Sequence, residues 1–196
     1  MTSICRLNNW SDRCENILNE QINLEYWASL QYHTMFAYFD RDYVGLKNIA
    51  EFFNKSSHEE REHAHKFIKY QNMRGGKVVI GDVKDFEFDV DIDSIFSNNN
   101  NNTPNGENTN NFHNHDVLEG FNKALEMEQI VYQKLLEVHK VGEEENDPQF
   151  CDFIEGEFLS EQIEAINQLS VYISQIKRIG ANNGHGLWDF DKNFKV

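Results

Sequence analysis

The chain has 196 residues, a length that fits one domain able to bury roughly 70% of its unfolded surface. Its 33 acidic residues outnumber the 18 basic ones and give a formal net charge of −15, which argues against a nucleic-acid partner and favours attraction of cations. The three cysteines, Cys5, Cys14 and Cys151, are odd in number and widely spaced, so we expect reduced thiols rather than a disulfide framework.

The chain begins with a polar segment that precedes a long helix. Residues 1–10 lack the apolar core of about 7 to 15 residues found in secretory signals, and no later segment has the about 18 apolar residues of a membrane span. We therefore expect a cytoplasmic protein with no membrane contact. From residue 11 to about 40 the apolar side chains recur at a helical period, with Ser11 as the cap.

A second helix is expected from Tyr43 to about Asn72, ended by Gly75-Gly76. The turn before it, near Asp40 to Asp42, is short, so the first two helices should be antiparallel neighbours. The connection from Lys77 to His115 is long enough to run the length of a bundle, which predicts that the second and third helices are parallel. Its asparagine-rich part, about 97–112, is expected to be a surface insertion.

The third and fourth helices have recognisable starts. The third is expected from Asp116, which opens a capping box, to about Val141. The pair Asp147-Pro148 supplies a cap and a first-turn proline for the fourth, which ends near Gly180. A tail at 187–194 predicts one more short helix. The fold class is therefore all-α: a four-helix bundle with one long crossover and a short C-terminal fifth helix, in a single domain of residues 1–196.

Glu60 and His63 form a Glu-x-x-His in the second helix, a spacing that places both side chains on one face, within reach of one metal ion. Alone the pair is weak evidence for a metal site, because such spacings are common on solvated helices. A carboxylate on the inward face of a bundle must be paired or bind metal, so a site needs partners from the other helices. The candidates there are Glu25 with Tyr32, Glu126 or Glu128, and Glu157, Glu161, Gln162 or Glu164.

Several short runs occur in a fixed order along the chain: Asn23-Leu24-Glu25, Phe39-Asp40-Arg41-Asp42, Ser57 to Ala64, Arg74-Gly75-Gly76, Asn146-Asp147-Pro148 and Cys151-Asp152-Phe153-Ile154-Glu155. Together they closely resemble ferritin, specifically its catalytic, heavy-chain type subunit, over nearly all of the chain except the asparagine-rich insertion. The resemblance implies an iron-storage ferroxidase that oxidises Fe(II) with dioxygen and deposits it as mineral. It also implies self-association into a hollow cage of 24 subunits.

The resemblance also implies roles for single residues. Glu25 and His63 resemble ligands of a di-iron ferroxidase centre, and Glu60 its bridging carboxylate. The remaining members of the centre are Tyr32 beside it, Glu128 as a ligand of the second iron and Gln162 as the residue that completes it. The fourth helix carries no second Glu-x-x-His, so we expect a weaker second iron position and transit of iron rather than a permanent cofactor.

Two further acidic pairs acquire roles from the resemblance. Glu59 and Glu62 resemble cavity-facing residues that start mineral growth, although His65 stands where a third carboxylate is common. Asp152 and Glu155 resemble the acidic lining of three-fold channels that draw cations inward. Asp152 and Glu155 can also be explained without any channel, because acidic side chains are favoured near a helix N-terminus.

Three other functions remain open. A light-chain-like subunit would only nucleate mineral, but it would lack Glu60 and His63 together, and this chain has both. A permanent di-iron oxidase of the same bundle class is disfavoured by Gln162 and by the missing second Glu-x-x-His. A plain helical interaction module explains the amphipathic helices but not the polar residues facing inward on all four.

Overall fold

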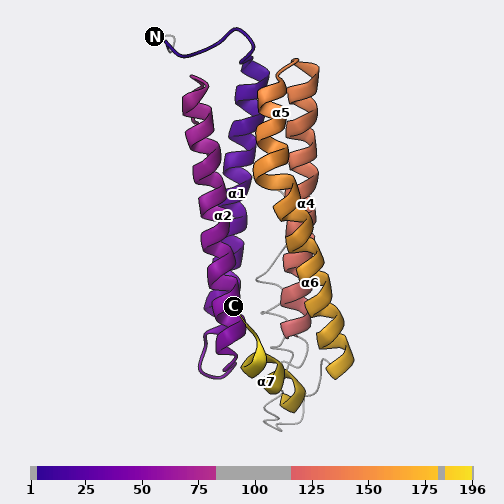
Figure 1. Ribbon diagram of the computed structural model, residues 1–196. Helices are drawn as coiled ribbons and strands as arrows, with labels where there is room; N and C mark the ends of the chain where they lie inside the picture. Colours follow the sequence, from indigo (N-terminus) through magenta and orange to yellow (C-terminus); the bar gives the residue numbers. More distant parts are fainter. Residues whose placement is uncertain (1–3, 83–115, 181–183, 196) are drawn as a thin grey trace, which may run out of the picture.

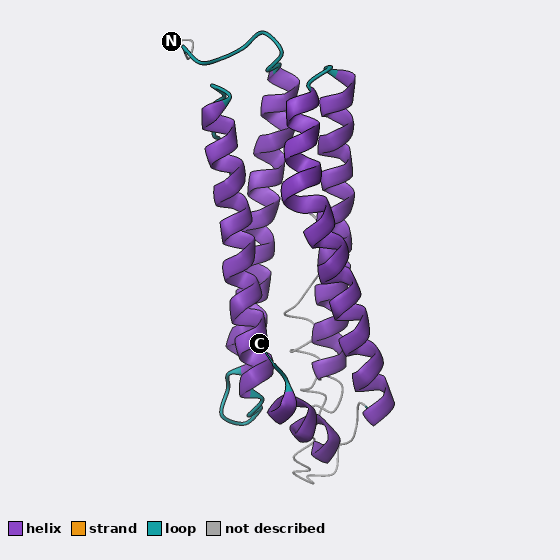
Figure 2. Cartoon of the chain, viewed as in Figure 1, coloured by secondary structure: helices purple, strands orange, loops and turns teal. Residues whose placement is uncertain are grey.

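The computed structural model describes residues 4–82, 116–180 and 184–195. In these ranges the regular structure is helical: α1 (Asp12–Phe39), α2 (Lys47–Met73), α4 (Asp116–Glu144), α5 (Pro148–Ile154), the π-helical turn η2 (Glu155–Leu159), α6 (Ser160–Ile179) and α7 (Gly184–Asn193). Four columns stand side by side, α1, α2, α4 and the α5–α6 pair (Figures 1 and 2), which confirms the expected bundle. The insertion expected at about 97–112 lies outside the described residues.

The helix directions agree with a bundle that has one long crossover. Helix α2 ends and α4 begins at opposite ends of the bundle, so the two run parallel (Figure 1). After α2 the chain turns back along α1, where two asparagines hold it. The Asn19 amide donates to Lys77 O and accepts from Val79 N, both at 2.9 Å. The Asn23 amide donates to Val79 O at 2.9 Å and accepts from Gly81 N at 2.8 Å.

Helix α2 begins at Lys47, four residues after the expected start at Tyr43. The reason is Gly45, whose φ of 68° is left-handed and incompatible with a right-handed helix. No side chain next to this start caps it. Instead Asp191, from the distant α7, accepts a hydrogen bond from Ile49 N at 2.8 Å. The C-terminal helix therefore supplies the cap of α2.

Two predicted caps are observed. Ser11 Oγ accepts from Cys14 N at 3.1 Å, and Asp147 accepts from Phe150 N at 3.1 Å with Pro148 following it. The fourth helix is not continuous as predicted, however, because η2 separates α5 from α6. A π-turn holds more residues than an α-turn, so it changes which side chains of α6 face the core.

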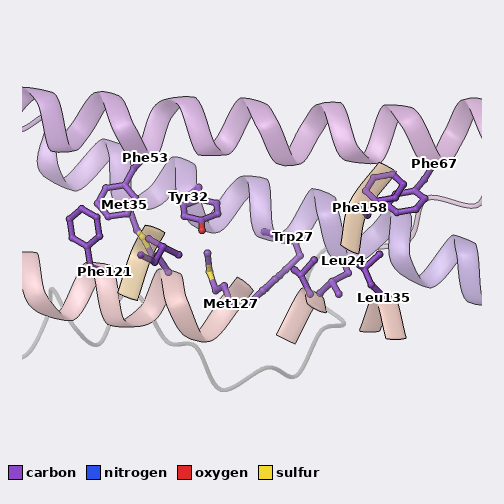
Figure 3. Close-up of a cluster of buried hydrophobic side chains, with 14 of the residues drawn as sticks. Leu24, Trp27, Tyr32, Met35, Phe53, Phe67, Phe121, Met127, Leu135 and Phe158 are labelled. Atoms are coloured by element: carbon purple, nitrogen blue, oxygen red, sulfur yellow. The ribbon is translucent and has the colours of Figure 1, made fainter. Parts of the chain in front are cut away.

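Aromatic residues pack the bundle core on both sides of its middle (Figure 3). Towards one end Phe53 packs near Phe121, with ring centroids 5.3 Å apart. Towards the other, Phe67 stacks on Phe158 at 4.0 Å. Tyr32 lies between the two groups with its hydroxyl pointing into the bundle. None of the described helices is both long and apolar enough to cross a bilayer.

A buried ion pair locks α2 to the junction between α4 and α5. The Arg74 guanidinium, 7% exposed, pairs with Asp147, which is fully buried. It also donates to Tyr70 Oη at 2.6 Å and to Gln149 Oε1 at 3.2 Å, and it lies 4.6 Å from the centroid of the Trp10 ring. Every charge in this cluster is thus compensated, as burial requires.

Candidate metal centre

The sequence-predicted site residues come together in the middle of the bundle. Each is less than 10% exposed: Glu25, Tyr32, Glu60, His63, Glu128 and Gln162. They come from α1, α2, α4 and α6. Five of the six line a cavity of about 60 Å³, which Glu59 and Glu161 also line. The structure therefore joins four separated sequence segments around one small polar space.

Glu25, Glu60 and His63 form one half of the site. Their ligand atoms all lie within 4.8 Å of one another. His63 Nδ1 is 3.5 Å from Glu60 Oε2, and Gln21 Nε2 donates to Glu25 Oε1 at 2.6 Å. The second oxygen of Glu25 and that of Glu60 are buried without a hydrogen-bond partner among the described residues. Buried oxygens of this kind are suited to receive a cation.

Glu128 forms the other half and is held from two helices. Tyr32 Oη donates to its Oε1. Gln162 Nε2 donates to its Oε2 and, at 3.0 Å, to its backbone carbonyl. The two donors hold the carboxylate in place from α1 and α6 and aim it at the shared cavity.

Among the three buried carboxylates, Glu60 repels both Glu25 and Glu128. Burial raises the pKa of Glu25 well above its ordinary value, and the adjacent Glu60 carboxylate raises it further. The pKa of Glu60 is likewise raised by burial and then by Glu128. Burial also raises the pKa of Glu128, although the hydrogen bonds from Tyr32 and Gln162 act in the opposite direction. A bound dication would remove this penalty, because it supplies positive charge.

The donor types suit iron. Carboxylate oxygens are hard ligands, and one imidazole adds the nitrogen that first-row transition metals accept well. The cysteines do not belong to this group: Glu25, Glu60 and His63 are the residues brought together. The three carboxylates and one histidine come from α1, α2 and α4, and they correspond to part of the set of four carboxylates and two histidines that symmetric di-iron bundles use.

Two contacts of the site were not predicted from the sequence. Gln21 lies one helical turn before Glu25, a spacing that places neighbours on one face, and it bonds that carboxylate. Glu161 was one of four candidates on the fourth helix, without an assigned role. Its Oε1 lies 3.4 Å from His63 Nε2. Because η2 changes the register of α6, sequence spacing could not select Glu161 from its neighbours.

The two acidic pairs lie on the surface, outside the buried set. Glu59 and Glu62 are exposed on α2, and Glu59 lines the mouth of the cavity. Asp152 and Glu155 are exposed and line a separate surface pocket of about 680 Å³. In that pocket His139 Nε2 lies 2.6 Å from Glu155 Oε1. The mineral-growth and channel roles of these pairs stay predictions.

Comparison with known proteins gives one consistent result. The model of the ferritin-like domain matches residues 15–179. The chain is 48% identical over 184 residues to "Ferritin, chloroplastic" of Malus baccata var. xiaojinensis, covering 94% of this chain and 65% of that protein. It is 46% identical over 184 residues to "Ferritin-1, chloroplastic" of Pisum sativum and to "Ferritin, chloroplastic" of Phaseolus vulgaris, covering 94% of this chain and 64% of each. The chain thus spans slightly less than two thirds of these relatives.

The names of these relatives contradict one expectation. All three are chloroplastic proteins, so the cytoplasmic location expected from the sequence is wrong on this comparison. The physical reason is that a polar N-terminal segment and unpaired thiols are equally compatible with a plastid location. Chloroplast transit peptides are amphipathic rather than apolar, and unpaired thiols alone do not single out the cytoplasm.

Proposed function

Because this chain belongs to the ferritin family, we propose that it stores and detoxifies iron as a ferroxidase subunit of a multi-subunit cage. Fe(II) and dioxygen are its substrates, and Fe(III) is deposited as mineral inside the cage. We extend the proposal to an assembly of 24 copies, as the family resemblance implies. The observation that carries it is the buried group of Glu25, Glu60 and His63, in which one oxygen of each carboxylate has no hydrogen-bond partner among the described residues.

Each residue has a distinct part in this proposal. Glu25 and His63 hold the first iron, Glu60 bridges the two irons, and Glu128 with Gln162 holds the second. Two irons that share Glu60 can each give one electron to the same dioxygen. Tyr32 Oη donates to Glu128, so this tyrosine keeps the second ligand in position. Its own pKa is raised well above the ordinary value by burial and then by Glu128, so it stays a hydrogen-bond donor.

The asymmetry of the centre favours release of the oxidised product. The first half offers two carboxylates and an imidazole, whereas the second offers Glu128, the shared Glu60 and an amide. An amide carries no charge, so it binds Fe(III) less strongly than a carboxylate would. Iron at the second position is therefore held weakly and can move on to the exposed carboxylates Glu59 and Glu62, where mineral growth begins. Asp152 and Glu155 attract Fe(II) to the three-fold channels through which it enters the cage.

The assignment is tested by the double variant Glu60→Lys with His63→Gly. We expect it to assemble normally and to lose fast Fe(II) oxidation, because it places an ammonium in the metal position and removes the imidazole. The matched control is Glu51→Lys with His58→Gly, which makes the same changes at exposed positions of α2. Oxidation at an undiminished rate in the first variant would overturn the site assignment.

A second measurement tests storage. Aerobic Fe(II) is added to the purified protein while the oxidation rate and the particle size are followed together. We expect fast oxidation that saturates at about two irons per chain, within a large particle. A small particle that turns over Fe(II) without retaining iron would favour a permanent di-iron oxidase instead, and retention without fast oxidation would favour a light-chain-like subunit.

A further inference from the structure

The imidazole of His63 lies between carboxylates from two different helices. Its Nδ1 is 3.5 Å from Glu60 Oε2 on α2, and its Nε2 is 3.4 Å from Glu161 Oε1 on α6. The edge of the ring meets Phe158, with centroids 5.8 Å apart and planes at 82°. The side chain of His63 is only 11% exposed. The ring is therefore enclosed on three sides and has little freedom to turn.

Glu161 is itself held on its other side. Lys66 Nζ lies 3.9 Å from Glu161 Oε2 and 3.5 Å from Glu157 Oε2. The ammonium also sits 5.6 Å from the centroid of the Phe158 ring. One oxygen of Glu161 thus faces the imidazole and the other faces a cation, which keeps the carboxylate directed at His63.

The contact between His63 and Glu161 can be understood from the way a histidine binds metal. A neutral imidazole has one N–H and one free lone pair, and a metal ion needs the lone pair. Nδ1 faces the buried carboxylates of the proposed iron position, so the lone pair belongs there and the N–H belongs on Nε2. The carboxylate oxygen that lies near Nε2, at 3.4 Å, is Glu161 Oε1. Carboxylates in this position fix the orientation of a ligating histidine and raise its basicity.

We propose that Glu161 is a positioning residue for the iron centre: it accepts the Nε2–H of His63 and so holds Nδ1 towards the metal. This inference rests on the proposed function and adds to it the residue that orients the single imidazole ligand. Glu161 acts through His63 and does not itself touch the metal. Lys66 supports the arrangement, because it neutralises the carboxylate oxygen that His63 does not use.

A purely structural role for Glu161 predicts a different result from a positioning role. Its side chain is 53% exposed, and partly exposed ion pairs contribute little to folding. Loss of Glu161 should therefore leave the assembled protein intact. The effect should appear instead in metal affinity, where loss of such an acceptor typically costs about 10- to 100-fold.

The test uses Co(II), which does not require oxidation, added anaerobically to the intact protein. Affinity is measured by calorimetry, and ligation is followed through the visible absorption bands of the bound ion. We expect Glu161→Ala to weaken the tighter binding step about 10- to 100-fold and to change the spectrum. Glu161→Gln should recover most of the loss, because its amide oxygen can still accept from Nε2–H. The matched control is Glu157→Ala, which removes the other carboxylate near Lys66 but not the one near His63.

A double-mutant cycle with His63 decides the mechanism. In a His63→Gly background, Glu161→Ala should have no further effect on Co(II) affinity, because no imidazole remains to be held. Equal losses in both backgrounds, or no loss in Glu161→Ala alone, would overturn the inference. A loss in Glu161→Gln as large as in Glu161→Ala would also overturn it, since that result indicates a need for charge rather than for an acceptor. Failure of the proposed function would give a different result. The unsubstituted protein and the His63→Gly variant would then bind Co(II) with the same affinity.

Discussion

Replacing Gln162 by glutamate tests whether the asymmetry of the centre controls how firmly iron is held. Without metal, Gln162 donates to both the carboxylate and the backbone carbonyl of Glu128. Gln162→Glu removes a charge-assisted bond that contributes about 1.5–3 kcal/mol. It also places two carboxylates close together, a repulsion of about 4 kcal/mol at 4 Å and an effective dielectric constant of 20. Proton uptake relieves part of this repulsion, so we expect the free energy of unfolding of the metal-free protein to fall by about 2–4 kcal/mol at pH 7.

When metal is bound, Gln162→Glu should be favourable instead of unfavourable. The same added charge now attracts a dication, so the weaker of the two binding steps should strengthen by at least about tenfold, equivalent to about 1.4 kcal/mol. Calorimetric titration with Zn(II) measures both steps, and transfer of oxidised iron into mineral should slow. Asn167→Glu is the matched control, because it adds the same charge at an exposed position of α6. The reasoning would be refuted if Gln162→Glu left the affinity of the weaker Zn(II) step unchanged, or lowered it, while the affinity of the tighter step stayed the same.

Three further predictions concern buried charged side chains, both in the site and elsewhere in the bundle. Arg74→Leu leaves Asp147 buried without its cation and should lower the free energy of unfolding by about 3–5 kcal/mol in urea denaturation; adding Asp147→Asn should recover part of the loss. Because burial raises the folded-state pKa of Glu25 and Glu60, the metal-free protein should lose stability as the pH rises from the ordinary carboxyl range through these raised values. Zn(II) affinity should change in the opposite sense and weaken as the pH falls, because protons compete for the same oxygens; thermal unfolding and titration across pH 5–8 measure both effects. Asp191→Ala removes the cap that α7 provides to α2 and should cost about 0.5–2 kcal/mol, visible as faster hydrogen exchange at the start of α2 with Zn(II) binding unchanged.

Most of the fold could be predicted because its signals are local. Ser11 and Asp147 cap the helices that they were expected to cap, and the length of the crossover gave the parallel direction of α2 and α4. The late start of α2 was missed, because a left-handed Gly45 and a cap from Asp191 depend on the turn and on a distant helix. The π-turn η2 was missed for a similar reason: its residues favour no distinct periodicity, and tertiary packing selects it.

The buried polar residues that the structure brings together could be listed from the sequence, but their contacts between helices could not. Helical spacing places Glu60 beside His63 and Gln21 beside Glu25, and both pairs are observed. The bond from Tyr32 to Glu128 joins residues 96 positions apart and depends on how α1 and α4 pack. Choosing Glu128 over Glu126 required the family resemblance. In the structure Glu128 is buried, whereas Glu126 pairs with Lys123 at 2.9 Å on the exposed side.

The division of the bundle into apolar ends and a polar middle explains how it can hold an unfavourable site. Buried carboxylates destabilise a metal-free fold, so the cost must be offset by packing elsewhere. Aromatic groups around Phe53 and around Phe67 lie on either side of the site, and the pair of Arg74 with Asp147 closes one end. None of these contacts uses a metal ion, so we expect them to keep the four columns in place without one and the carboxylates to stay preorganised for a cation. On this expectation the fold does not depend on bound metal, which is what the proposed transit of iron requires and what a site for a permanent cofactor does not.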